Sequence, residues 1–376
     1  MIQKGFDLKI WMVMLSELPD SMMVKSLIRL PVKSLMLCRC VCKSWYNLVS
    51  DPYFICLHLS QQSIDKKGYL LTAHQKNSPL REQYSFRCDE TFLEKLILER
   101  PISESRGAFS LVGCAKGLLL MLNPGPSDSD LHLWNPGLHR IKPLPSAPAT
   151  YKYMFHREAL GFAFLPDICD YKVIRIFDFF SDYDGVAGFA EIYSLKTDSW
   201  RRIETPTPVM RLSVLPRAPL VASFVNSVFY WVVPTYQDNH RTDCILSFNM
   251  KCETFKMTGL PVACLEQGCV QGSLEVFQES LYLFVFHVGK DRSLWIMKEN
   301  CSCELYWLKI CMIEYLDRWP VGFMKNGDVI LEDVERKVSL HDPRNMCSPR
   351  NSECEMGWEL RISKAYNYSP SLALLE

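Results

Sequence analysis

The sequence predicts an α+β chain of two parts. A small N-terminal unit of three helices comes first, and a large all-β domain, resembling a β-propeller of about six blade-like units, follows it. Apolar residues recur at helical spacing over residues 16–59, which is typical of amphipathic helices. From about residue 66, short runs rich in Val, Ile, Tyr, Phe and Trp recur about every 50 residues, which is typical of propeller blades. We therefore expect domains at 14–60 and 66–376.

The N-terminal unit is predicted from three amphipathic segments. Asp20 or Ser21 can cap the first helix, and Pro31 ends it or turns the chain into the second. The apolar positions are Met23, Val24, Leu27, Ile28 and Leu30 in the first segment, Leu35 and Met36 in the second, and Val41, Trp45, Leu48 and Val49 in the third. Asp51 and Pro52 stop the third helix. So small a unit is marginal alone, so it either packs on the rest of the chain or covers its apolar face with a partner.

The large domain is predicted from its repeats. Compact apolar runs begin at residues 69, 118, 172, 228, 281 and 328. A second strand-like run follows in each unit from the second onward, and three of these runs lead to Trp200, Phe255 and Trp307. The steady period favours stacked propeller blades over the alternative of one or two irregular β-sandwiches.

Composition excludes some classes of partner. Lys plus Arg and Asp plus Glu both number 42, so no charge excess indicates nucleic acid or a membrane surface. No run approaches the roughly 20 apolar residues of a membrane span. The apolar run 10–15 is short for a secretory signal and lacks a small-residue cleavage site after it. We expect a cytoplasmic or nuclear protein.

The 16 cysteines are spaced irregularly for a disulfide framework. Cys38, Cys40 and Cys42 lie two apart, whereas zinc sites use wider spacings and a second pair of ligands. We expect reduced cysteines that serve as small apolar residues, with no metal and no zinc at these three positions.

Catalytic motifs are absent from the sequence. It contains no phosphate-binding glycine loop, no G-x-S-x-G and no H-E-x-x-H. Asp167, Asp170 and Asp178 have the spacing of turn-capping residues. We predict no catalytic residue and no cofactor, although a propeller enzyme or lectin with a helical cap stays an alternative.

Several motifs resemble a known plant family. Leu18-Pro19 and the stretches 27–35, 39–45 and 48–54 are similar to an F-box of the plant type. Further stretches resemble the F-box-associated, kelch-like domain of the same family, including Gly113–Leu119, Leu133–Pro136 and the closing stretch Tyr366–Leu372. The two likenesses follow one another in the family's order and cover most of the chain.

The resemblance implies a substrate receptor of an SCF-type cullin–RING ubiquitin ligase. Its F-box would bind a Skp-type adaptor, which joins the cullin and RING subunit, and its β domain would bind an unknown protein target. The implied role is non-catalytic, because the receptor only places a target lysine near the charged enzyme. The residues expected to bind the adaptor are Leu18, Pro19, Leu27, Ile28, Leu30, Pro31, Val32, Leu35, Val41 and Trp45. Some of them, Trp45 included, can instead belong to the core of the F-box.

Two other functions stay open. One is a propeller that acts as a protein-interaction scaffold without a ligase. The other is an S-locus F-box, a relative that recognises style ribonucleases. Target recognition is expected on loops, because loops vary between family members. Polar, charged or Pro/Gly-rich composition indicates 124–130, 178–189 and 234–243.

Overall fold

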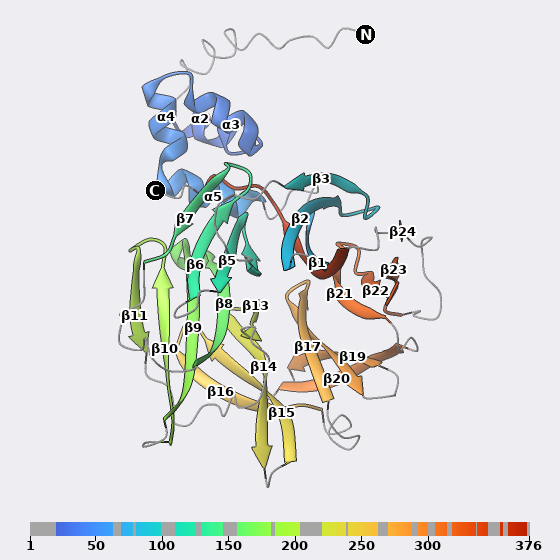
Figure 1. Ribbon diagram of the computed structural model, residues 1–376. Helices are drawn as coiled ribbons and strands as arrows, with labels where there is room; N and C mark the ends of the chain where they lie inside the picture. Colours follow the sequence, from blue (N-terminus) through green and yellow to red (C-terminus); the bar gives the residue numbers. More distant parts are fainter. Residues whose placement is uncertain are drawn as a thin grey trace.

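The computed structural model places a group of short helices against a ring of β-sheets (Figure 1). It describes residues 20–62, 69–77, 80–98, 110–124, 129–145, 156–181, 185–203, 220–237, 240–261, 270–287, 292–299, 305–313, 318–335, 337–344, 354–355 and 360–373.

The helical part differs from the prediction by one helix. Its described helices are α2 (Asp20–Leu27), α3 (Val32–Arg39), α4 (Lys43–Ser50) and α5 (Pro52–Gln62). Pro31 precedes α3 in extended conformation, as predicted. The sequence pattern predicts the stop at Asp51 and Pro52 but not the helix α5 that follows it. Asp51 also caps the next helix, since its Oδ1 accepts hydrogen bonds from the backbone N–H of Tyr53 at 2.8 Å and of Phe54 at 3.2 Å.

The β domain is a propeller of six antiparallel blades. The strands of each blade, in spatial order, are as follows: β4 (Ser110–Ala115), β5 (Leu118–Pro124), β6 (Ser129–Asn135) and β7 (Arg140–Pro143); β8 (His156–Leu165), β9 (Asp170–Ser181), β10 (Gly185–Ser194) and β11 (Ser199–Ile203); β13 (Ser223–Val225), β14 (Val228–Gln237), β15 (His240–Asn249) and β16 (Thr254–Gly259); β17 (Val270–Phe277), β18 (Ser280–His287), β19 (Arg292–Glu299) and β20 (Leu305–Ile313); β21 (Trp319–Phe323), β22 (Val329–Glu332), β23 (Lys337–His341) and β24 (Cys354–Glu355); β25 (Leu360–Tyr368), β1 (Tyr69–Asn77), β2 (Leu80–Cys88) and β3 (Glu94–Leu98). The short β12 (Leu220–Val221) pairs in parallel with β8.

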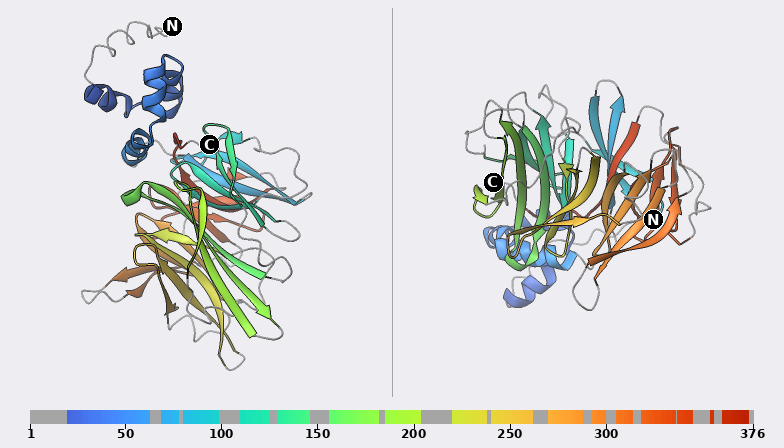
Figure 2. Two further views of the ribbon diagram at one scale, coloured as in Figure 1. Left: turned by 90° about the vertical axis from the view of Figure 1, so that its left-hand side faces the viewer. Right: turned by 90° about the horizontal axis from the view of Figure 1, so that it is seen from below.

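The predicted repeat matches one strand of every blade. The six apolar runs lie in or at the start of β5, β9, β14, β18, β22 and β1, each the second strand of its blade. First strands of neighbouring blades contact one another, namely β25 with β4, β4 with β8, β8 with β13, β13 with β17 and β21 with β25. Figure 2 gives two further views of the arrangement of the sheets. The second strand is therefore covered on both edges and both faces, which explains why it is the most apolar.

Six apolar clusters join the blades, and each cluster draws residues from two neighbours. Phe229, Trp231 and Phe248, all 0% exposed, fill the interface between the second and third blades of the chain. The last strand, β25, pairs with β1 and closes the ring with the two ends of the domain. Because every sheet packs against two others in a closed ring, the sandwich alternative is wrong.

Candidate functional site

The helices have a core of their own, which contains half of the residues expected to bind an adaptor. Leu27 is 1% exposed and Leu35 is 0% exposed. The five expected residues in this core are Leu27, Ile28, Val32, Leu35 and Trp45. Their side chains hold the helices together and are not available at the surface. Leu18 and Pro19 lie outside the described residues.

The other three expected residues are accessible. Pro31 is exposed at the start of α3, while Leu30 and Val41 are half-buried at the rim of the helical core. The carbonyl oxygen of Leu30 lies 3.0 Å from Nε2 of His58, so the α2–α3 turn is held against α5. These three residues therefore form an accessible apolar surface to which a partner can bind.

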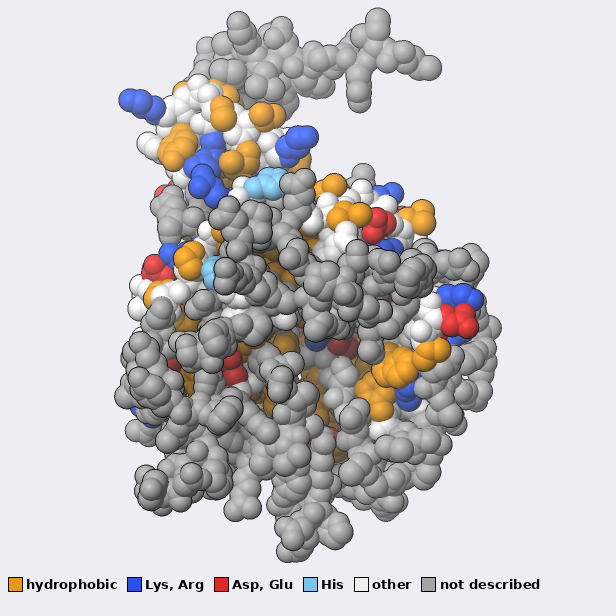
Figure 3. All heavy atoms as spheres, in the orientation of Figure 1, with side chains coloured by type: hydrophobic (Ala, Val, Ile, Leu, Met, Phe, Trp, Pro, Cys, Tyr) orange, Lys and Arg blue, Asp and Glu red, His pale blue; other side chains and the backbone are white. Residues whose placement is uncertain are grey.

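The helical surface also carries apolar residues that the sequence reasoning missed. Met22, Leu37, Tyr46 and Tyr53 are 55%, 57%, 47% and 72% exposed. They lie outside the apolar face that each helix buries. An apolar residue at such a position is the sequence signal that could have indicated a binding surface. Between residues 21 and 50 there are five Lys or Arg and no Asp or Glu, and Figure 3 shows orange and blue side chains together on this unit. The surface is both apolar and positively charged.

The three cysteines of this region lie in α3 and in the connection between α3 and α4. Cys40 ends α3 and Cys42 precedes α4, and both are exposed, whereas Cys38 is half-buried. Within the described ranges, no group of three or more His, Cys, Asp or Glu could hold a metal ion.

Helix α5 connects the helical core to the propeller. Phe54, at its start, is 1% exposed in the helical core, and Leu59, five residues later, is 1% exposed in the cluster between the β4–β7 and β8–β11 blades. Ile55 packs against both clusters. One helix therefore contributes to two cores, which fixes its orientation on the propeller.

The C-terminal segment after β25 makes a second connection. Leu372 is 1% exposed and lies in the helical core, where Leu138 from the β6–β7 turn packs nearby. The next residue, Ala373, packs in the propeller cluster that holds Leu59. The closing stretch of the chain thus lies between the two parts and contributes to both.

Asn135 anchors this C-terminal segment. Its side chain is 0% exposed, and Nδ2 donates to the carbonyl oxygens of Ala373 at 3.0 Å and Ser371 at 3.2 Å. Its Oδ1 accepts from the N–H of Leu138 at 3.2 Å. A single amide therefore satisfies buried backbone groups from two distant parts of the chain.

Gly117 leaves room for the same segment. Its φ of +80° suits glycine, and a Cβ there would lie 2.6 Å from the carbonyl oxygen of Ser369 and 2.6 Å from Cβ of Ser371. The motifs around Gly117 and Asn135 thus meet the distant C-terminal segment in one region. We call this region, where α5 and residues 369–373 contact both the helical core and the propeller, the joint. The sequence shows these motifs as marks of the resemblance, but it does not predict that they contact one another.

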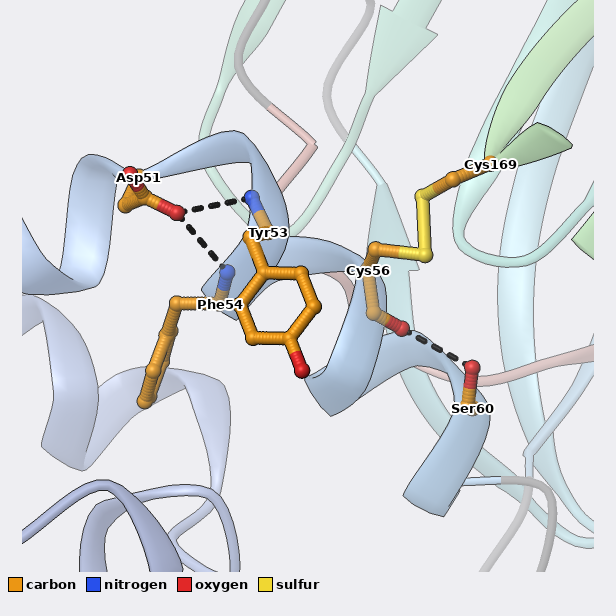
Figure 4. Close-up of a disulfide and its surroundings, with 6 residues drawn as sticks. All are labelled: Asp51, Tyr53, Phe54, Cys56, Ser60 and Cys169. Carbon is orange, nitrogen blue, oxygen red and sulfur yellow. Dashed lines mark hydrogen bonds between the residues drawn. A yellow bond between two sulfur atoms is a disulfide. The ribbon is translucent and has the colours of Figure 1, made fainter. Parts of the chain in front are cut away.

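A disulfide crosses the joint and corrects the expectation that the cysteines are reduced. Cys56 of α5 is bonded to Cys169, with Cα atoms 5.9 Å apart (Figure 4). Cys169 follows the short 3-10 turn η1 (Pro166–Ile168) between β8 and β9. Nothing in the spacing of two cysteines 113 residues apart could have predicted this pair, because connectivity does not follow from sequence.

A groove of about 620 Å³ lies along the joint, lined by Tyr53, Cys56, Lys142, Asp198 and others from both parts. Lys142 Nζ lies 2.8 Å from Asp198 Oδ2, and the Tyr193 hydroxyl donates to Asp198 Oδ1 at 2.6 Å. Lys142, followed by Tyr193, lowers the pKa of Asp198. Lys142 and Asp198 are therefore paired with each other within the groove.

The expected recognition loops are hairpins on the opposite face of the propeller. The turn before β5 touches the C-terminal segment, and the turn before β9 carries Cys169, so these strands run away from the helices. Residues 178–181 and 185–189 belong to β9 and β10, and 234–237 and 240–243 to β14 and β15. The expectation that these stretches are loops is therefore wrong for their described parts, since strand pairing reaches Ser181 with Gly185 and Gln237 with His240. Residues 125–128, 182–184 and 238–239 lie outside the described residues.

In the described part of the chain, no helix is long and apolar enough to span a membrane.

The fold and the joint define a class of protein in which a helical unit with an exposed apolar surface is fixed to one face of a six-bladed propeller. Residues 88–346 match the F-box associated beta propeller domain, and residues 15–57 match the F-box domain. The chain therefore belongs to the family of F-box proteins with an F-box associated propeller.

Similar proteins include F-box protein CPR1 of Arabidopsis thaliana, 29% identical over 309 residues that cover 76% of this chain and 70% of that protein. An F-box/kelch-repeat protein of the same plant is 26% identical over 344 residues, 87% of this chain and 88% of its own. Among solved structures, TolB from Acinetobacter baumannii has a TM-score of 0.43 and 12% identity, over 78% of this chain and 68% of that one.

Proposed function

We propose that this protein is the substrate-recognition subunit of an SCF-type cullin–RING ubiquitin ligase. The helical unit binds a Skp-type adaptor, and through it a cullin and RING subunit, while the propeller binds the target protein. The observation that carries this proposal is the F-box itself, with its exposed apolar residues, joined to a six-bladed propeller through α5 and the C-terminal segment. The role is non-catalytic and belongs to the cytoplasm or nucleus.

The surface of the helices indicates the chemistry of the adaptor. Burial of one exposed Leu or Met side chain contributes about 1.5–3 kcal/mol. Pro31, Leu37 and Met22 are exposed, so contact with several of them can support a stable complex after association costs. The five basic residues between 21 and 50, without an acidic one, favour an adaptor surface that is apolar at its centre and acidic at its rim.

The joint allows the propeller to hold a target at a fixed position relative to the F-box. Proximity catalysis requires that a bound target be held at a defined place relative to the charged enzyme. Because α5 and the C-terminal segment each contribute to the helical core and to the propeller, a target on the far face has a fixed position relative to the adaptor. The hairpins β5–β6, β9–β10 and β14–β15 are the proposed target-binding elements.

Co-purification with a Skp-type adaptor tests the proposal. We expect a one-to-one complex with the wild-type chain, lost in the double variant Leu30→Ala/Pro31→Ala. Leu30 also touches the helical core, so a second variant is needed that leaves the core intact. Leu37→Asp places a charge at a residue 57% exposed, and we expect it to weaken adaptor binding about tenfold or more.

The matched control is Leu96→Asp. Leu96 lies on β3 of the propeller and is 56% exposed, so the substitution has the same chemistry outside the helical unit. We expect adaptor affinity to stay at the wild-type value. The proposed function is contradicted if the folded wild-type chain binds no adaptor. It is also contradicted if both helical variants bind the adaptor with wild-type affinity.

A further inference from the structure

The disulfide at the joint has a particular position. Cys56 lies in α5, the helix that connects the helical core to the propeller. Cys169 lies in a turn of the propeller, so the bond joins the two functional parts covalently. By contrast, other cysteines of the described residues, such as Cys38, Cys40 and Cys252, are not disulfide-bonded. A bond at this place can affect how firmly the helices are held.

Small reagents can reach the two sulfur atoms. Both cysteines are half-buried and line the wall of the groove of about 620 Å³, beside Tyr53 and Asp198. Tyr53 is 72% exposed, so the groove is open on this side. An oxidant or a reducing thiol can therefore approach the pair in the folded protein.

The joint does not depend on the bond for its existence. Leu59 and Leu372 are each 1% exposed, in the propeller cluster and in the helical core respectively, and Asn135 holds the C-terminal segment by hydrogen bonds. These contacts keep the two cysteines close, with Cα atoms 5.9 Å apart, within the range that a disulfide needs. The bond can form and break without rearrangement of the propeller.

We propose that Cys56 and Cys169 form a reversible redox modification site that controls the stiffness of the joint between the F-box and the propeller. In the oxidised form α5 is fixed to the propeller, and in the reduced form the helical unit is held by non-covalent contacts alone. The reversibility rests on the proposed function, since the compartments where ubiquitin ligases act keep thiols reduced.

The chemistry requires a peroxide as oxidant. One thiolate attacks a peroxide oxygen, breaks the O–O bond and becomes a sulfenic acid, with release of water after protonation. The second thiolate attacks that sulfur, forms the S–S bond and displaces hydroxide, which leaves as a second water. Two electrons pass from the sulfurs to the peroxide. A protein dithiol restores both thiols by exchange and is itself oxidised to a disulfide.

Mass spectrometry and hydrogen exchange on the purified full chain, without adaptor, test the proposal. The protein is treated with dithiothreitol or with stoichiometric hydrogen peroxide, free thiols are alkylated, and digests are searched for linked peptides. We expect a Cys56–Cys169 peptide after peroxide and its loss after dithiothreitol. Amide exchange in α5 is expected to be several-fold slower in the oxidised form.

Two variants and a control make the result specific. Cys56→Ser and Cys169→Ser are expected to abolish the redox dependence of exchange in α5, and the second keeps the test possible if the first impairs folding. Cys252→Ser, at an exposed cysteine of another blade, is expected to behave as wild type. Full alkylation of both cysteines after peroxide, or equal exchange in α5 in the two wild-type forms, overturns the proposal. Neither result depends on adaptor binding, so the proposed function succeeds or fails separately.

Discussion

At the scale of single residues, His74 shows how surroundings fix a charge. It is 2% exposed in β1, and Nε2 lies 2.7 Å from Thr72 Oγ1 and 2.9 Å from Ser85 Oγ. Burial, followed by the nearby charge of Arg87, lowers the pKa of His74 to about 3. The ring is therefore neutral in the folded blade at physiological pH, where it bonds to the two hydroxyls.

This lowered pKa predicts a pH dependence of stability. In the unfolded chain His74 binds a proton near its ordinary pKa of 6.5, so below that pH the unfolded state holds more protons, and stability falls as the pH is lowered from about 6.5 toward 3. From pH 7 to pH 5 the loss is roughly 2 kcal/mol. Urea unfolding followed by tryptophan fluorescence measures it.

The variant His74→Gln removes the titrating group and is expected to make the stability of the propeller less dependent on pH over this range. His139→Gln, at an exposed turn position, is the control and is expected to retain the wild-type slope. An unchanged slope in His74→Gln contradicts the assignment.

At the scale of elements, the β4–β5 turn contains a glycine that contacts a segment distant in the sequence. Gly117 has φ +80° and lies against the backbone of Ser369 and Ser371. The residue before it, Lys116, also has positive φ, so both residues of the turn are left-handed. The φ of the turn and the close approach of the C-terminal segment both require glycine at position 117.

Gly117→Ala is expected to destabilise the protein by roughly 1–3 kcal/mol, because its Cβ overlaps the C-terminal segment and its φ is unfavourable. Gly259→Ala is the matched control, since a Cβ there meets nothing within 4 Å. We expect it to be neutral or slightly stabilising. Thermal unfolding of both variants gives the comparison, and equal melting temperatures contradict the explanation.

At the scale of the whole molecule, the ends of the chain hold it together. β25 closes the ring against β1, and the residues after β25 then enter the helical core through Leu372. The C-terminal segment therefore contributes to both closure of the propeller and attachment of the F-box. Damage to its anchor is expected to loosen the helices before the blades.

Asn135→Ala tests this expectation. It removes the donor to two buried carbonyl oxygens, which costs roughly 1–3 kcal/mol, and we expect faster amide exchange throughout α2 to α5 with little change in the distant blade β17–β20. The control is Asn367→Ala, because Asn367 is exposed on β25. If the helices keep wild-type protection in Asn135→Ala, the helical unit is independent of the C-terminal anchor.

The sequence by itself determined the two-part organisation, the helices α2 to α4, the repeat of the blades and the family. These features depend on periodic apolar patterns and local turn chemistry, which a linear sequence displays directly. It also gave the motifs around Gly117, Asn135 and Leu372, though without a reason for them.

Only the tertiary structure decided which apolar residues of the F-box are buried and which are exposed, and it alone joined Cys56 to Cys169. It also showed that Asp51 caps the start of helix α5, and that α5 and the C-terminal segment both contact the helical core and the propeller. The physical reason is that periodicity identifies an apolar face but not the residues that pack against it. Contacts between residues more than 100 positions apart arise from how blades and helices pack, which no local pattern specifies.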